Sequence, residues 1–119
     1  VTSALALMPF AGASALGTTL AAVHAIARMA AVDFAQHGIT ANVVAPGWLA
    51  GAEFEALPEA TQAHIRAGIP LARPGSMDEV AGVVRFLASA AGGYITGAVL
   101  PADGGYTLTR SDGRTLLRP

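Results

Sequence analysis

The feature that most constrains the fold is the segment 16–37, in which apolar side chains recur at helical spacing. One stripe has apolar residues three or four positions apart: Leu16, Leu20, Val23, Ala27, Ala30 and Phe34. Ile26, Met29 and Val32 populate a second side of the same segment. A helix that is apolar on two sides is buried on two sides. The spacing therefore predicts a long helix that packs on a sheet and on a second helix, and that ends at Gly38.

Shorter patterns place the remaining elements. Apolar runs bounded by Pro and Gly predict buried strands over 39–45 and 98–102. Residues 1–3 are typical of a strand end and residues 4–15 of a loop, and a helix is expected over 59–67. Ser76 and Glu79 form a capping box that opens a helix to about residue 90. Its inward residues are expected to be Val80, Val83, Val84 and Leu87. These elements indicate an α/β fold: a partial, Rossmann-like doubly wound parallel sheet flanked by helices.

Composition excludes several classes of function. All seven basic residues are Arg, there is no Cys, and the net charge is −1. The absence of Lys excludes lysine-dependent chemistry, and the absence of Cys excludes disulfides and thiolate metal sites. Near-neutral charge without a basic patch argues against nucleic acid as a partner. Three glutamates, Glu53, Glu55 and Glu59, lack His partners at metal spacing, so no metal is expected.

Two kinds of targeting segment are compatible with an apolar composition. Residues 4–15 are apolar and end in Ala13-Ser14-Ala15, which imitates a signal peptide, but no positive segment precedes them and Pro9 and Gly12 interrupt them. No stretch of about 20 uninterrupted apolar residues exists, so no membrane span is expected. A cytoplasmic location fits this pattern.

The order of the motifs along the chain points to a family. Ser3 comes first, then an Ala/Gly-rich linkage and the long helix. The later motifs are Asn42-Val43-Val44-Ala45-Pro46-Gly47, Arg73-Pro74-Gly75-Ser76 and Thr96-Gly97 followed by Asp103-Gly104-Gly105. This order resembles the C-terminal half of the short-chain dehydrogenase/reductases. The resemblance covers residues 1–107 and leaves 108–119 as a polar tail. It implies NAD(P) as the family's cofactor and a subunit interface built by the helix 16–37.

Two residues depart from the family pattern. In that family a Tyr lies 13 residues after the catalytic Ser and a Lys four residues after the Tyr; here those positions hold Leu16 and Leu20. The Tyr transfers a proton while hydride moves to or from nicotinamide, and the Lys lowers the Tyr pKa and holds the ribose. A positioned acid or base contributes roughly 10²–10⁴ in rate, and Leu cannot supply it. Apolar residues at i, i+4 are also typical of ordinary core packing.

Four positions match the family's site. Ser3 matches the catalytic Ser, and is also typical of an ordinary strand end. Pro46, Gly47 and Trp48 match the segment that lies against the nicotinamide, and Trp48 either closes an apolar hollow or stacks on a ligand. Gly51 stands five residues after Pro46, where the family has a Thr. His24 is the nearest candidate for a replacement base, but its expected position is a partly exposed or interface site.

Three functions remain open. The first is a non-catalytic family member that pairs with an active relative or binds a ligand. The second is an NAD(P)-dependent oxidoreductase whose cofactor-binding N-terminal half lies outside this chain. The third is a truncated remnant without a function of its own. The chain lacks the family's Gly-rich phosphate turn, so no cofactor is expected for this chain alone. A homo- or hetero-oligomer with a chain of the same fold is expected through helix 16–37.

Overall fold

The computed structural model describes residues 1–8 and 11–109 and contains two strands and four α-helices in that range. In chain order these are α1 (Ser14–Asp33), β1 (Val43–Pro46), α2 (Ala52–Glu55), α3 (Glu59–Gly68), α4 (Met77–Leu87) and β2 (Val99–Ala102). Short 3₁₀ turns add Ala4–Ala6, Ala35–His37, Ala90–Gly92 and Tyr106–Leu108. Most of the predicted tail 108–119 lies outside the described residues.

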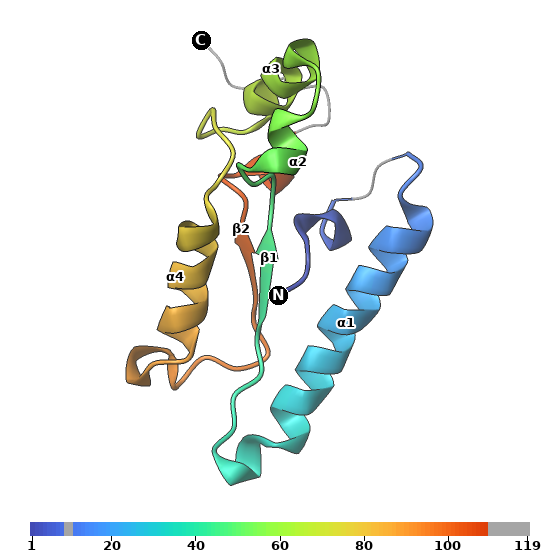
Figure 1. The fold of residues 1–119 in the computed structure, drawn as a ribbon. Coiled ribbons are helices and arrows are strands. Elements are labelled where there is room, and N and C mark those ends of the chain that lie inside the picture. The colour runs from blue at the N-terminus through green and yellow to red at the C-terminus, as the bar shows by residue number, and fades with distance from the viewer. Residues whose placement is uncertain (9–10, 110–119) are drawn as a thin grey trace.

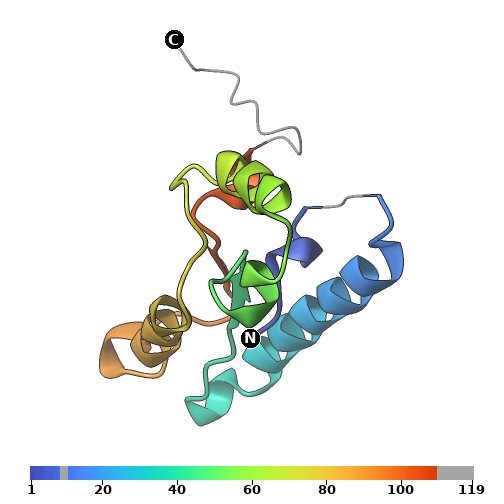
Figure 2. The same ribbon diagram turned by 45° about the horizontal axis from the view of Figure 1, so that its top comes forward.

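The two strands form a parallel pair between helices. Val43 pairs with Val99 and Pro46 with Ala102. The pair lies between α1 and α4, while α2 and α3 lie beyond the carboxyl end of β1 (Figures 1 and 2). All four residues of β1 are buried. The predicted α/β class with a parallel sheet flanked by helices is therefore confirmed.

The start of the chain lies beside β1. The Thr2 N–H donates to the Val44 carbonyl at 2.9 Å, although residues 1–3 do not belong to a strand. The segment 4–15, which was expected to be a loop, contains the 3₁₀ turn Ala4–Ala6. Its last two residues already belong to α1, which begins at Ser14. This hydrogen bond brings Ser3 close to the carboxyl end of β1.

Both strands are shorter than predicted for a specific reason. The Ala41 N–H donates to the Thr96 hydroxyl at 3.1 Å, and the Asn42 side-chain amide donates to the Ile95 carbonyl at 2.7 Å. The Asn42 side-chain oxygen accepts from the Ala98 N–H at 3.0 Å. Before Val43, side-chain bonds thus alternate with backbone bonds such as the one from the Gly97 N–H to the Ala41 carbonyl at 2.7 Å. Asn42 joins the entry of β1 to the entry of β2.

Helix α1 is less buried than the sequence pattern predicted. It ends at Asp33, earlier than predicted. Gly38, the predicted end, instead caps the following 3₁₀ turn Ala35–His37 and has a φ of 70°. Only His24 and Ala31 of α1 are buried. Leu16, Val23 and Phe34, predicted to face the core, are 52%, 41% and 49% exposed. That prediction was wrong because the helix meets the turn Ala4–Ala6, Thr2 and Gly97, which cover a narrower line than the apolar stripe.

The other predicted helices are confirmed with small changes. Helix α3 spans Glu59–Gly68, and α4 has the predicted capping box at Ser76. Helix α4 ends at Leu87, earlier than expected, and Ser89 begins a turn that Gly92 closes. Val80 is buried, but Val84 is 39% exposed, which corrects its assignment as an inward residue. Val84 and Leu87 instead line an open hollow with Asn42 and Val44.

Helix α1 also has the length and composition of a membrane-spanning helix, by those two criteria alone. The same criteria are met by core helices of proteins that do not enter membranes. Gly17, Thr18, Thr19 and His24 interrupt its apolar surface. The finding is weak evidence and assigns no location.

Candidate functional site

A small cavity lies where the start of the chain meets the carboxyl end of β1. Its volume is about 190 Å³. The lining residues are Ser3, Ala4, Leu5, Gly47, Trp48 and Tyr106. Three of the four predicted site residues, Ser3, Gly47 and Trp48, therefore share one cavity. The fourth, Pro46, is a buried residue of β1 and is not part of the lining.

Ser3 is held at the cavity by a local hydrogen bond. It is half-buried and caps the turn Ala4–Ala6, where its Oγ accepts from the Leu5 N–H at 3.2 Å. This bond uses the hydroxyl as an acceptor and keeps its O–H as a donor. Ser3 can orient a carbonyl oxygen in the cavity.

Beside the cavity, the Pro46-Gly47 motif meets the Asp103-Gly104-Gly105 motif. The Gly47 N–H donates to the Ala102 carbonyl at 3.1 Å. The Asp103 carboxylate accepts from the Gly105 and Thr107 N–H groups, each at 2.9 Å. These bonds fix the turn that carries Tyr106 into the cavity wall. Sequence reasoning missed Tyr106, although its place directly after Gly104-Gly105 was a signal that could have indicated it.

Trp48 is fixed by contacts on its far side. Its ring meets Phe54 edge-on, with centroids 6.3 Å apart and an interplanar angle of 61°. The Arg66 guanidinium lies 5.5 Å from the Phe54 ring centroid. Gly75 donates its N–H to the Trp48 carbonyl at 2.9 Å. The Trp48 side chain is thus joined to the small α2–α3 core, in which Phe54, Ile65 and Ile69 are buried.

Neither leucine at the family's Tyr and Lys positions lines this cavity. Leu16 is 52% exposed and Leu20 is half-buried. Leu16 is therefore not the packed core residue that its spacing suggested. The cavity lining contains hydroxyls from Ser3 and Tyr106 but no charged or imidazole side chain. The arrangement can bind and orient an uncharged group.

His24 has a structural role at the start of the chain. It is buried, and its Nε2 lies 2.8 Å from the Thr2 hydroxyl oxygen. Burial, and then the charge of Arg28, lowers the pKa of His24 below its usual 6.5. The expectation of a partly exposed or interface histidine was wrong, because α1 turns this side chain toward the start of the chain. His24 positions the residue next to Ser3.

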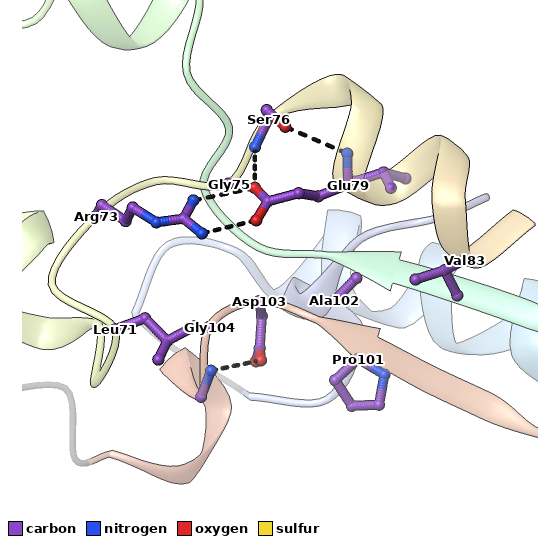
Figure 3. Close-up of a pocket in the computed structure, with 12 residues that line it drawn as sticks. Leu71, Arg73, Gly75, Ser76, Glu79, Val83, Pro101, Ala102, Asp103 and Gly104 are labelled. Carbon is purple, nitrogen blue, oxygen red and sulfur yellow. Dashed lines mark hydrogen bonds and ion pairs between the residues drawn. The ribbon is translucent and has the colours of Figure 1, made fainter.

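A larger cavity lies elsewhere, between α4 and the end of β2, and measures about 480 Å³ (Figure 3). Its polar side chains bond one another. Arg73 donates to the two Glu79 carboxylate oxygens at 3.0 and 2.7 Å, and Glu79 accepts from the Ser76 N–H at 2.7 Å. These bonds hold the pKa of Glu79 at about 2, mainly through Arg73. The cluster stabilises the start of α4, and the Asp103 carboxylate, which also lines this cavity, is used by the backbone N–H groups of Gly105 and Thr107.

Metal ligands are not gathered at either cavity. Within residues 1–8 and 11–109, no group of three or more His, Asp or Glu side chains is placed to hold a metal ion. The predicted acidic residues Glu53, Glu55 and Glu59 lie on α2 and α3 and are exposed. Glu59 pairs with Arg66 at 3.1 Å.

Comparison with known proteins identifies the family. The family model described as enoyl-(acyl carrier protein) reductase matches residues 1–107. A short-chain type dehydrogenase/reductase from Mycobacterium ulcerans superposes with a TM-score of 0.83 at 28% identity, covering 92% of this chain and 40% of that one. This chain belongs to the short-chain dehydrogenase/reductase family. The resemblance drawn from the motifs is confirmed, and the fold is that of the family's Rossmann-type sheet.

The relatives are oxidoreductases or members of the same family. Protein FixR of Bradyrhizobium diazoefficiens is 45% identical over 84% of this chain and 34% of its own length. The 3-oxoacyl-[acyl-carrier-protein] reductase MabA of Mycobacterium bovis is 47% identical over 71% of this chain and 34% of its own. A blue fluorescent protein from a metagenomic library, solved with NADPH, gives a TM-score of 0.81 at 36% identity, covering 88% of this chain and 42% of that one.

The match covers only part of each relative. The chain spans about a third of the length of these curated proteins. NAD(P) is the cofactor that family resemblance indicates. The roles of Ser3, Pro46, Gly47 and Trp48, and the replacement of the catalytic pair by Leu16 and Leu20, stay predictions.

Proposed function

We propose that this chain is a non-catalytic short-chain dehydrogenase/reductase subunit that binds a small uncharged ligand beside Ser3 without turning it over. The observation that carries the proposal is the pair Leu16 and Leu20 at the positions of the proton donor and its activating cation. Ser3 can orient a carbonyl oxygen, but reduction also needs a proton at that oxygen. No side chain lining the cavity combines an acidic proton with a neighbouring cation.

Tyr106 does not replace the missing tyrosine in this proposal. Its ring edge packs over Gly68, where an added Cβ would lie 3.4 Å from Tyr106 Cε2, and against the Phe54–Ile65–Ile69 cluster. The chain contains no Lys that could stand beside its phenol. Tyr106 acts as a wall of the cavity.

The residues of this chain do not fit a complete NAD(P) site. A dinucleotide pyrophosphate is held by a Gly-rich turn that leads from a strand into a helix with a strong dipole. The helix that follows β1 is α2, which has four residues and begins after Gly51 without a side-chain cap. Residues 46–48 are retained at the position that faces the nicotinamide in the family. We therefore propose weak or absent NAD(P) binding by this chain alone.

The exposed side of α1 supports pairing with another chain of the same fold. Ile26, Met29 and Val32 are 66%, 62% and 74% exposed. Covering one such side chain contributes roughly 1.5–3 kcal/mol. Ala22 and Ala25 lie on the same side of the helix, and their small side chains permit close approach of a second helix. The proposed partner is a second copy or an active relative, bound without a membrane or nucleic acid, and the proposed location is the cytoplasm.

Restoring the lost residues tests the absence of catalysis. NAD(P)H oxidation would be followed with a panel of ketones for the unmodified protein and for the double variant Leu16→Tyr, Leu20→Lys. We expect no turnover above buffer for the unmodified protein. Turnover by the unmodified protein that persists through rigorous purification and depends on Ser3 would refute the proposal. Activity gained only by the double variant would attribute the missing catalysis to Leu16 and Leu20, and would contradict the proposed weak NAD(P) binding.

A further inference from the structure

We propose that Trp48 divides a longer ligand channel into two compartments and thereby limits the length of the ligand. The inference rests on the proposed binding of a ligand beside Ser3. Two hollows meet at this residue. Gly47 and Trp48 line the Ser3 cavity of about 190 Å³ and also a second hollow of about 380 Å³. The other residues of the second hollow are Leu49, Glu53, Phe54 and Leu57.

The contacts of Trp48 hold it in this dividing position. Phe54 is 5% exposed and meets the Trp48 ring edge-on, so the indole rests on a fixed surface. The backbone on either side is held by Gly75, which donates to the Trp48 carbonyl at 2.9 Å and accepts from the Ala50 N–H at 2.7 Å. Phe54 thus supports the ring and Gly75 holds the backbone that carries it, while the indole stays 37% exposed.

The chemistry of the two compartments indicates the class of ligand. No residue lining the Ser3 cavity is charged, and Ser3 keeps a donor O–H for one acceptor. The other lining residues are apolar apart from the Tyr106 hydroxyl. The second hollow is apolar apart from the exposed Glu53, which disfavours an anionic tail. The ligand that fits is an uncharged carbonyl compound whose apolar chain stops at Trp48.

The volumes make the effect of Trp48 measurable. Pockets for drug-sized ligands measure about 300–1,000 Å³, so the Ser3 cavity is small and the second hollow is not. Trp48→Ala removes the indole that separates them and leaves the Gly75 hydrogen bonds to the backbone intact. In that variant a longer chain gains new apolar contact, worth roughly a fourfold affinity increase for each buried methylene.

The test uses straight-chain methyl ketones as probes. Dissociation constants of 2-butanone, 2-hexanone, 2-octanone and 2-decanone would be measured by ligand-observed NMR for the unmodified protein, Trp48→Ala and Trp48→Phe. We expect the affinity of the unmodified protein to stop rising within the series and that of Trp48→Ala to continue rising. Trp48→Phe keeps a ring and should retain the limit. Ser3→Ala should weaken all four ketones equally without moving the limit.

Different failures have different meanings. No binding of any ketone by the unmodified protein or by Trp48→Ala would overturn ligand binding beside Ser3, and this inference with it. Binding with the same chain-length dependence in both proteins would overturn the role of Trp48 and leave the proposed function standing. Circular dichroism checks folding. If Trp48→Ala does not fold, a continuous rise to 2-decanone in the unmodified protein still overturns the inference.

Discussion

Gly47 and Asp103 touch so closely that no side chain fits at position 47. A Cβ built on Gly47 would lie 2.7 Å from the Asp103 Cβ and 2.9 Å from its Cα. Gly47 follows β1, and Asp103 follows β2 in the paired register. The Pro-Gly and Asp-Gly-Gly motifs are 56 residues apart in the chain because they are the two halves of one contact at the strand ends.

Substitution of this glycine should destabilise the fold. Gly47→Ala forces the two strand ends apart, and we expect a loss of about 1–3 kcal/mol in the free energy of unfolding. Urea denaturation followed by circular dichroism measures it. The control is Gly82→Ala in α4, where the nearest atom to the new Cβ is the Arg85 guanidinium at 3.8 Å. That variant should gain stability, by up to about 1 kcal/mol. Equal midpoints for Gly47→Ala and the unmodified protein would contradict the contact.

The Arg73–Glu79 pair should make the start of α4 sensitive to acid. The folded protein holds the Glu79 pKa at about 2, below the ordinary value of 4.5. Because this pKa is depressed, its stabilising effect is complete above pH 4.5 and is lost as the pH falls toward 2. Glu79→Gln should lower the midpoint of thermal unfolding at pH 6. Between pH 4.5 and 2, the midpoint of this variant should depend less on pH than that of the unmodified protein. Asp78→Asn, one residue earlier on the exposed surface, is the control. Parallel pH profiles for Glu79→Gln and the unmodified protein would show that the pair has no such effect.

His24 should add a second pH dependence at a higher range. Its pKa is lowered in the folded state by burial and by Arg28, so the unfolded chain takes up a proton first. Stability from the neutral imidazole is present above pH 6.5 and decreases as the pH falls below it. Thermal midpoints between pH 7.5 and 5 should fall for the unmodified protein and less for His24→Gln. His37→Gln, on the exposed turn after α1, is the control. A histidine NMR titration showing His24 protonated at pH 7 would overturn this dependence.

Helix α1 should carry a subunit interface. We expect a dimer, a tetramer or a hetero-complex at micromolar concentration by light scattering, because the exposed apolar side of α1 gains free energy when covered. Replacing Ala25 and Met29 by Glu places charges on that side and should dissociate the assembly. Ala63→Glu, on the exposed surface of α3, is the matched control and should leave it intact. A well-folded monomer for the unmodified protein would refute the interface.

The site was accessible from the sequence only in part. Ser3, Gly47 and Trp48 could be named because each stands at a fixed distance from a motif. Tyr106 and Leu5 were missed, since the cavity wall to which they belong exists only after two distant segments meet. The burial of His24 was also missed, because its partner Thr2 lies 22 residues away.

The sequence by itself determined the local elements and the family. Capping residues such as Ser76, the stop at Gly38 and the apolar runs of the strands act over a few residues, and such short-range signals survive without a tertiary context. Leu16 and Leu20 likewise can supply neither an acidic proton nor a positive charge, whatever the packing. The tertiary structure alone decided which apolar residues of α1 are covered. Burial depends on what lies opposite a side chain: Thr2 lies against His24 and Gly97 lies against Ala31, while Leu16, Met29 and Val32 are left exposed.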